Sequence, residues 1–259
     1  LPQRKAVLVR NLQTGDEQEY AYDKLLIATG ARPIIPQIKG HDLKGIFSLR
    51  LLEDGIAIKD YIQNESPKTA LLVGAGSIGM EMAESFAVAG LKVIVVEKIS
   101  NILGTMDDEI NELVEQELKR NGVELIKSRM VSGFAGKDSR VIKVLLDNGR
   151  SLDTDMAIIG AGVRPNTELA VDAGVALGVA GAIKVNERME TNLPDIYAAG
   201  DCAEAYHLVY RRNIYMPLGT TANKQGRTAG ENMAGGQSSF AGIVGTSVFK
   251  AFDMEVGRT

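Results

Sequence analysis

The sequence predicts an α/β fold built around a parallel β-sheet. Thr69–Val73 and Val93–Val96 are short apolar runs of the length of buried strands. Between them, apolar side chains recur at helical spacing at Ile78, Met82, Phe86 and Ala89. A strand, a helix and a second strand in this order form a βαβ unit, in which the two strands run parallel. Further short apolar runs predict additional buried strands at Leu25–Ala28, Val123–Ile126, Ala157–Ile159 and Ile196–Ala199.

The turn after the first strand of this unit carries Gly74, Gly76 and Gly79 in the pattern G-x-G-x-x-G. In dinucleotide sites the first glycine permits a tight turn, the second lets the backbone approach a pyrophosphate, and the third lets the helix pack closely. The helix N-terminus offers unpaired N–H groups to the phosphates. The alternative is a glycine-rich turn without a ligand, but the correct order of strand, turn, helix and second strand favours a Rossmann-like dinucleotide site.

Glu97 ends the second strand, where an acid accepts hydrogen bonds from the adenosine ribose. A 2′-phosphate there would be repelled, so the sequence favours NADH over NADPH. Lys98, the next residue, weakens that preference.

Length and composition predict a globular protein of about two domains, with 259 residues and 45% hydrophobic residues. The formal charge of −4 gives no sign of a nucleic-acid or membrane partner, and no apolar run is long enough to span a bilayer. A single cysteine, Cys202, excludes an internal disulfide and favours a reducing, cytoplasmic compartment. The chain starts at Leu1 rather than Met, so a removed leader remains open.

The remaining elements follow from local patterns. Asn148-Gly149 predicts a hairpin between Val141–Leu146 and Ser151–Leu152. The other predicted elements are strands at Val7–Arg10, Glu19–Tyr22, Ile183–Val185 and Thr246–Phe249, and helices at Asp54–Ile62, from Asp107 to Gly122, and at Thr220–Met233.

Five motifs in sequence resemble those of the flavin-dependent pyridine nucleotide-disulfide oxidoreductases, over essentially the whole chain. They are Ala28-Thr29-Gly30, Gly74–Gly79 with Glu97, Gly162–Asn166, Thr191–Asp201 and Pro217–Arg227. The last motif, PLGTTANKQGR, is similar to the branch that contains NADH oxidases, coenzyme A-disulfide reductases and persulfide reductases.

The resemblance implies a Rossmann-like three-layer NAD-binding domain, with a parallel sheet and a β-meander, inserted in a partial and similar FAD-binding domain. The implied boundaries are 1–36 and 166–245 for the FAD-binding segments, 37–165 for the NAD(P)-binding domain, and 246–259 for the start of a truncated dimerisation domain.

The resemblance also implies contacts for two nucleotides. For NAD(H) the expected residues are Gly74, Gly76, Ser77, Ile78, Gly79, Glu81, Glu97, Lys98 and Gly162. For FAD they are Ala28, Thr29, Gly30, Gly200, Asp201, Leu218, Gly219, Thr220 and Ala222. Asp201 would accept a hydrogen bond from the ribityl chain. The helix that starts near Leu218 would stabilise negative charge on the reduced flavin through its N-terminus.

Several of these residues have an equally simple structural interpretation. Glu81 is either a nicotinamide-facing acid or a solvated helix residue, Gly162 is either a space for the nicotinamide or a turn glycine, and Thr220 or Thr221 is alternatively a helix cap. Arg32 and Arg164 each precede a proline at a domain crossover and suggest structural roles.

We expect Cys202 to be buried rather than to act as a redox thiol, and His41 and His207 to pack or lie at the surface. No residue of this chain is assigned a catalytic or metal-binding role.

Two parts of the family pattern are absent from this sequence. Leu1–Lys24 holds only Gly15 and therefore no glycine fingerprint for FAD, and no cysteine precedes the dinucleotide domain. We therefore expect an internal fragment that binds NADH weakly and lacks FAD and disulfide reductase activity.

The parent protein is expected to be a homodimeric enzyme that passes a hydride from NADH to FAD and electrons on to a disulfide, a persulfide or O₂. Two alternatives remain open, a ferredoxin or rubredoxin reductase and a non-catalytic NADH-binding module.

Overall fold

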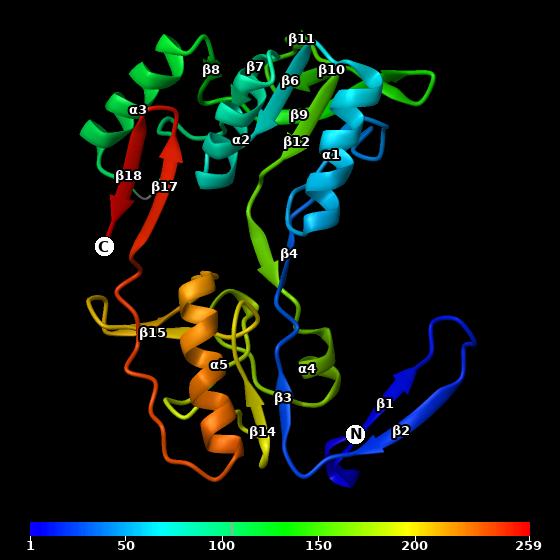
Figure 1. Cartoon of the computed structure of the whole chain (residues 1–259), viewed down its shortest axis with the longest axis vertical. Coiled ribbons are helices and arrows are strands. Elements are labelled where there is room, and N and C mark those ends of the chain that lie inside the picture. The colour runs from blue at the N-terminus through cyan, green and yellow to red at the C-terminus, as the bar shows by residue number, and fades with distance from the viewer. Residues whose placement is uncertain (105) are drawn as a thin grey trace. The chain divides into compact units, whose positions relative to one another are not determined.

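The computed structural model describes residues 1–104 and 106–259, and it has the predicted α/β fold (Figure 1). The contacts between residues divide the chain into two units. Unit 1 comprises Leu1–Arg32, Arg164–Thr246 and Thr259, and unit 2 comprises Pro33–Val163 and Ser247–Arg258.

Unit 2 is built on a five-stranded parallel sheet with the strand order β5-β12-β6-β7-β8. The strands are β5 (Ile46–Phe47), β6 (Thr69–Val73), β7 (Lys92–Val96), β8 (Glu124–Ile126) and β12 (Met156–Ile159). In this register Val73, Val96 and Ile159 lie side by side, because Val73 pairs with both of the others. The carboxyl ends of the three central strands therefore meet at one edge, which is where ligands bind in open α/β sheets.

Two different layers cover the faces of this sheet. Leu72 and Val95 pack against helices α1 (Leu52–Glu65), α2 (Ser77–Val88) and α3 (Asp108–Arg120). Leu71 and Ile94, the alternate residues of the same strands, lie in a second core with the antiparallel meander. The meander strands are β9 (Val131–Lys137), β10 (Arg140–Leu146) and β11 (Ser151–Asp153).

The buried face of α2 differs from the one that the sequence pattern indicated. Gly79, Met80, Ala83 and Phe86 are buried, whereas Ile78 is 41% exposed. The helix must place its small residues against the end of β6, and this rotates Ile78 toward solvent. Met82 is half-buried against the core and Ala89 is exposed, so Phe86 alone of the four spaced residues is fully buried.

The C-terminal hairpin, β17 (Ser247–Ala251) and β18 (Met254–Arg258), packs on unit 2. Phe249, Phe252 and Val256 enter the core shared with α2 and α3. Glu84 of α2 fastens the hairpin, since its carboxylate accepts a hydrogen bond from Lys250 Nζ at 2.6 Å and one from the Phe252 N–H at 3.0 Å. The hydrogen bond from Lys250 holds the pKa of Glu84 below its ordinary value of 4.5.

Unit 1 contains the parallel pair β3 (Leu25–Ile27) and β14 (Ile196–Ala198). Ile27, Ile196 and Cys202 belong to one of its apolar cores, and Tyr197 and Ala229 belong to the other. The remaining elements are η1 (Pro2–Arg4), the hairpin β1 (Ala6–Arg10) and β2 (Glu17–Ala21), α4 (Glu168–Asp172), η2 (Val179–Gly181), the hairpin β15 (Ala205–His207) and β16 (Arg212–Ile214), and α5 (Gly219–Met233).

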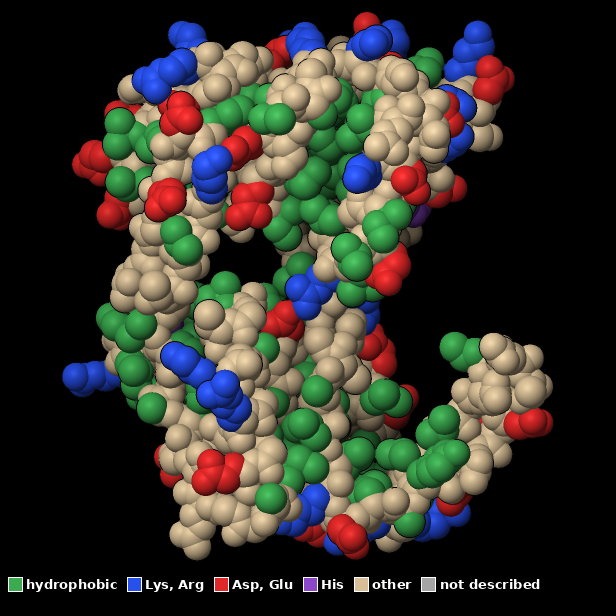
Figure 2. Space-filling view, in the orientation of Figure 1, with side chains coloured by type: hydrophobic (Ala, Val, Ile, Leu, Met, Phe, Trp, Pro, Cys, Tyr) green, Lys and Arg blue, Asp and Glu red, His purple; other side chains and the backbone are tan. Residues whose placement is uncertain are grey.

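One strand expected in unit 1 differs from the sequence-based prediction. The strand predicted at Ile183–Val185 is not formed, because Ile183 makes only isolated bridges, to Leu177 and Ala203. The short segments β4 (Ala31–Pro33) and β13 (Val163–Pro165) pair with each other. On the face seen in Figure 2, acidic and basic side chains are interspersed.

We predict that Glu84→Ala loosens the hairpin and lowers Tm by about 2–4 °C at pH 7. The folded state depresses the pKa of Glu84, so its contribution is present above about pH 4.5 and is lost as the pH falls through the lower, folded-state value. The difference in Tm between the two proteins should therefore shrink below about pH 4.5. Calorimetry across pH checks this, with the exposed Glu112→Ala of α3 as the control; a difference that is independent of pH would contradict the ion pair as its cause.

Candidate functional site

The turn that leaves β6 is set by backbone packing at Gly74. Its φ of +102° favours glycine, and a Cβ atom at this position would lie 2.5 Å from the Gly160 carbonyl oxygen. The Gly74 N–H donates to the Val96 carbonyl at 2.8 Å, which continues the pairing of β6 with β7 by one residue. The chain therefore turns away at the carboxyl edge of the sheet.

The other two glycines of the turn have different surroundings. A Cβ atom on Gly79 would collide with the Gly74 carbonyl oxygen, so this position lets α2 pack against the end of β6. A Cβ atom on Gly76 would meet nothing within 4 Å, and its φ of −78° is open to any residue. Gly76 thus leaves free space in front of the backbone, at the N-cap of α2, where no side chain caps the helix.

Ser77 and Ile78 continue this exposed surface into the first turn of α2. Because no side chain accepts from the first N–H groups, the α2 N-terminus offers donors and a partial positive charge toward solvent. These are the requirements for holding an anionic group such as a pyrophosphate.

Glu97 lies at the end of β7 and is bound to the glycine turn. Its Oε2 accepts the Ala75 N–H at 2.8 Å, and its Oε1 accepts the Ile99 N–H at 3.1 Å. Each carboxylate oxygen has a second lone pair, so the half-buried side chain can still accept hydrogen bonds from a ligand. Lys98 follows it and is exposed.

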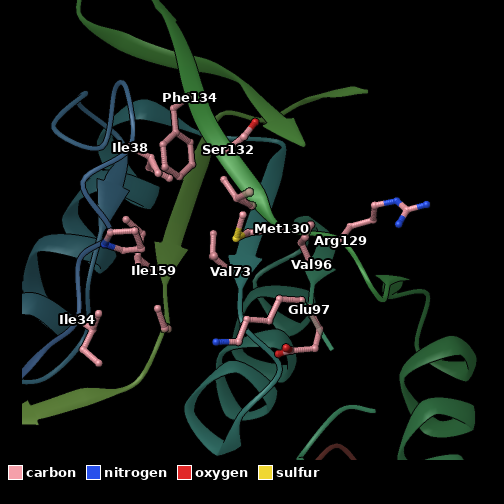
Figure 3. Close-up of a pocket in the computed structure, with 16 residues that line it drawn as sticks. Ile34, Ile38, Val73, Val96, Glu97, Arg129, Met130, Ser132, Phe134 and Ile159 are labelled. Carbon is pink, nitrogen blue, oxygen red and sulfur yellow. The ribbon is translucent and has the colours of Figure 1, made fainter. Parts of the chain in front are cut away.

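A cavity of about 610 Å³ opens at the carboxyl ends of β6, β7 and β12 (Figure 3). Gly74, Glu97 and Lys98 from the predicted set line it. The rest of its wall is largely apolar, with residues from the segment before β5, from β12 and from the meander. These lining residues are Ile34, Pro36, Ile38, Val73, Val96, Arg129, Met130, Val131, Ser132, Phe134, Ile159, Gly160 and Ala161.

The sequence does not predict the apolar residues of the cavity wall. Figure 3 shows Ile38 and Phe134 together at one end of the cavity and Glu97 at the other. The Phe134 N–H donates to the Lys39 carbonyl at 2.7 Å, which brings the meander to the segment near Ile38. The side chain of Arg129 extends away from the other labelled residues (Figure 3) and donates to the Ser128 carbonyl. In the sequence, this wall is indicated only by the apolar residues Met130, Val131 and Phe134.

The other predicted NAD(H) residues are not among those that line this cavity; they are Gly76, Ser77, Ile78, Gly79, Glu81 and Gly162. Glu81 is exposed on α2, one turn after Ser77, so its two interpretations both remain predictions. Gly162 has a φ of +98°, and its carbonyl accepts the Ile34 N–H at 2.9 Å. A turn that needs glycine is therefore present at Gly162.

In unit 1, Asn166 holds the Ala28-Thr29-Gly30 segment that follows β3. The Asn166 N–H donates to the Gly30 carbonyl at 2.9 Å, and its Nδ2 donates to the Thr29 carbonyl at 2.9 Å. Thr29 Oγ1 donates to the Asn166 carbonyl at 2.5 Å. The exposed segment is thus fixed by a residue from the motif that follows Gly162.

Arg32 has the structural role that its place in the sequence suggested. Its guanidinium donates to Asn166 Oδ1 at 2.5 Å and forms an ion pair with Glu168. The hydrogen bond from Arg32 lowers the pKa of Glu168 to about 2.

The Gly200-Asp201 turn follows β14, beside the start of α5. Gly200 has a φ of +85°, and a Cβ atom there would lie 3.6 Å from the Ala222 Cβ. The N-cap of α5 is Leu218, without a side-chain cap, and neither Thr220 nor Thr221 fills that role. Gly219 and Thr220 are exposed in the first turn, so this helix also presents unpaired N–H groups.

Cys202 is fully buried, as the sequence indicated, with Sγ 3.4 Å from the carbonyl oxygens of Ile27 and Ala199. His207 is also buried and stacks on Tyr210 with ring centroids 4.2 Å apart. His41 Nδ1 lies 2.9 Å from the Ile38 carbonyl oxygen.

Among residues 1–104 and 106–259, no group of three or more His, Cys, Asp or Glu side chains is placed to hold a metal ion. Within the same residues, none of the helices combines the length and the apolar character needed to cross a bilayer.

Comparison with known proteins gives a consistent result. The family model described as pyridine nucleotide-disulphide oxidoreductase matches residues 1–226. An NADH oxidase of Methanocaldococcus jannaschii is 41% identical over 246 residues, covering 95% of this chain and 54% of the relative. The chain thus spans about half the length of this curated relative.

Two solved structures show the same fold over nearly the whole chain. A NAD-dependent persulfide reductase from A. fulgidus superposes with a TM-score of 0.93 at 38% identity, covering 98% of this chain and 46% of that one. An FAD-dependent pyridine nucleotide-disulphide oxidoreductase from Desulfovibrio vulgaris superposes with a TM-score of 0.91 at 36% identity, covering 99% and 65%.

Proposed function

Because this chain belongs to the pyridine nucleotide-disulphide oxidoreductase family, we propose that it forms the NADH site and part of the FAD site of an oxidoreductase. The observation that carries the proposal is the cavity at the carboxyl edge of the unit 2 sheet, next to a helix N-terminus that Gly76 leaves open. When bound, the nicotinamide supplies a hydride and the flavin accepts it. The relatives named above are an NADH oxidase and a persulfide reductase.

The residues of unit 2 fit a nicotinamide nucleotide. The backbone at Gly76 and the uncapped start of α2 would hold the pyrophosphate, since they offer N–H donors and unfilled space. Glu97 would accept the ribose hydroxyls with the lone pairs that the Ala75 and Ile99 N–H groups leave. The negative charge of Glu97 beside the ribose favours NADH over NADPH, and the neighbouring Lys98 reduces the difference.

The residues of unit 1 fit part of a flavin nucleotide. Asp201 lies in the turn that follows β14, where its carboxylate would accept a hydrogen bond from a hydroxylated chain. The uncapped N-terminus of α5 would stabilise the negative charge that develops on a flavin when it accepts a hydride. Thr29 and Gly30, held by Asn166, would support the ribose and pyrophosphate region.

The electron acceptor is a disulfide, a persulfide or O₂ in this proposal. For a disulfide the overall reaction consumes NADH and one proton and yields NAD⁺ and two thiols. No thiol of this chain takes part, because Cys202 is fully buried. Homodimerisation of the parent protein remains a prediction from the resemblance.

The proposal is tested by mixing NADH anaerobically with the full-length polypeptide that carries this chain, and following the visible absorbance of its flavin. We expect rapid bleaching with NADH and slower bleaching with NADPH. A disulfide, a persulfide or O₂ is then added to separate samples of the reduced protein. The compound that restores the flavin absorbance is the electron acceptor. Binding of NADH with no bound flavin would instead support the non-catalytic module and overturn the proposal.

The three glycine environments predict that two substitutions in the turn act differently. Gly76→Ala should leave Tm unchanged, because its methyl group meets nothing, but it should weaken NADH binding by at least about tenfold by filling the pyrophosphate space. Gly79→Ala should lower both Tm and affinity, because its methyl group collides with the Gly74 carbonyl. Calorimetric titration and thermal melts separate the two effects.

Gly55→Ala on α1 is the matched control, because its Cβ atom would lie 4.0 Å from the nearest atom, in Leu49. It should keep NADH affinity and stabilise the helix by about 0.5–1 kcal/mol. Unchanged NADH affinity in Gly76→Ala would contradict the proposal that the pyrophosphate binds at this turn.

The carboxylate of Glu97 should set the preference between the two coenzymes. Glu97→Gln removes the charge and retains one acceptor, so we expect NADH binding to weaken about tenfold and NADPH binding to weaken less. The measurement is the ratio of the two dissociation constants in the variant and the wild type. If both affinities fall by the same factor, Glu97 acts only by holding the turn through Ala75 and Ile99.

A further inference from the structure

Gln225 is a fully buried polar side chain in the middle of α5. Its Oε1 accepts the Gly200 N–H at 2.9 Å, and its Nε2 donates to the Glu204 carbonyl oxygen at 3.0 Å. A buried amide is unfavourable unless its hydrogen bonds are made, and an apolar side chain of similar size would fill the same volume. The role of Gln225 in the fold is therefore to make these two hydrogen bonds, which an apolar side chain could not make.

Both partners of Gln225 belong to one turn, and they are its two ends. The turn runs from Gly200 to Glu204, and the Ala203 N–H closes it on the Gly200 carbonyl at 2.9 Å. Asp201 lies inside it, and its carbonyl accepts a hydrogen bond from the Tyr215 hydroxyl at 3.0 Å. One side chain from α5 thus spans the segment that presents Asp201.

The same helix begins with the residues proposed to face the flavin. Ala222 lies one turn before Gln225, and its Cβ would be 3.6 Å from a Cβ atom on Gly200. The Gly200–Glu204 turn is therefore close to the first turn of α5 at Ala222 and is hydrogen-bonded to the same helix through Gln225. Neither can shift along the other without breaking the hydrogen bonds of Gln225.

We propose that Gln225 is a positioning residue that fixes the Asp201 turn against α5, so that Asp201 and the α5 N-terminus hold the flavin as one rigid unit. This inference rests on the proposed function, because it assumes that both elements contact FAD. It assigns no contact with FAD to Gln225 itself, whose side chain is enclosed by protein.

The test compares Gln225→Met with the wild type in the full-length flavoprotein. Methionine keeps the length of the side chain and removes both hydrogen bonds. We expect the dissociation constant for FAD to rise about tenfold, which corresponds to the loss of one well-placed hydrogen bond to a charged group. The midpoint potential of the bound flavin should become more negative, because a displaced α5 N-terminus stabilises the reduced form less.

Asn232 provides the matched control on the same helix. It is also a buried amide, its Nδ2 donates to the Arg188 and Ser238 carbonyls, and its Oδ1 accepts the Ser238 N–H. These bonds fasten the far end of α5 and do not touch the Asp201 turn. Asn232→Leu should therefore lower Tm by an amount similar to Gln225→Met and leave FAD affinity and potential unchanged.

Tyr215→Phe serves as a second, milder variant if Gln225→Met fails to fold. It removes the hydroxyl that donates to the Asp201 carbonyl, and we expect about a threefold rise in the FAD dissociation constant. Equal effects of Gln225→Met and Asn232→Leu on affinity and potential would overturn the inference while leaving the proposed function intact. The same holds for an unfolded Gln225→Met combined with an unaffected Tyr215→Phe. A wild-type protein that binds no FAD would overturn both the inference and the flavin half of the proposed function.

Discussion

The close approach of backbone to backbone at the end of β6 is the constraint on which unit 2 depends. Gly74 lies against the Gly160 carbonyl, and Gly79 lies against the Gly74 carbonyl, with no room for a side chain at either contact. These contacts bring three strand ends and the start of α2 to the same edge of the sheet. A concave, partly apolar cavity with helix N–H donors beside it follows from that geometry.

The sequence predicts the parts of this arrangement that are encoded locally. The strand from Thr69 to Val73 and the glycine spacing are contiguous signals, and both the strand and the helix that follows it are found in the structure. The orientation of α2 is not local, because it depends on which residues can approach Gly74. This is why Ile78, which fits the helical period, lies at the surface while Met80 and Ala83 are buried.

The same distinction applies to the candidate sites. Glu97 could be identified because its position relative to the glycines is fixed by one βαβ unit. Phe134 and Ile38 could not be identified in this way. They are brought together by the hydrogen bond from the Phe134 N–H to the Lys39 carbonyl, which joins residues about ninety-five positions apart in the sequence. Gln225 lies in a recognisable motif, but its two partners are 25 and 21 residues away, and no spacing rule connects a helix glutamine to a strand-end turn.

Glu97 and Gln225 each hold a turn that follows a strand, one in each unit. In each case a strand ends in a glycine with positive φ, and a side chain from another element accepts an N–H of the turn, from Ala75 in one unit and Gly200 in the other. The difference is in burial and charge. Gln225 is fully buried and makes a hydrogen bond with each end of its amide, so its side chain positions the turn and does not reach a ligand. Glu97 is half-buried and charged, and each of its oxygens keeps one lone pair. It can therefore hold the turn and accept hydrogen bonds from a ligand at the same time. For this reason we propose that Glu97 selects the coenzyme, whereas Gln225 only positions the turn.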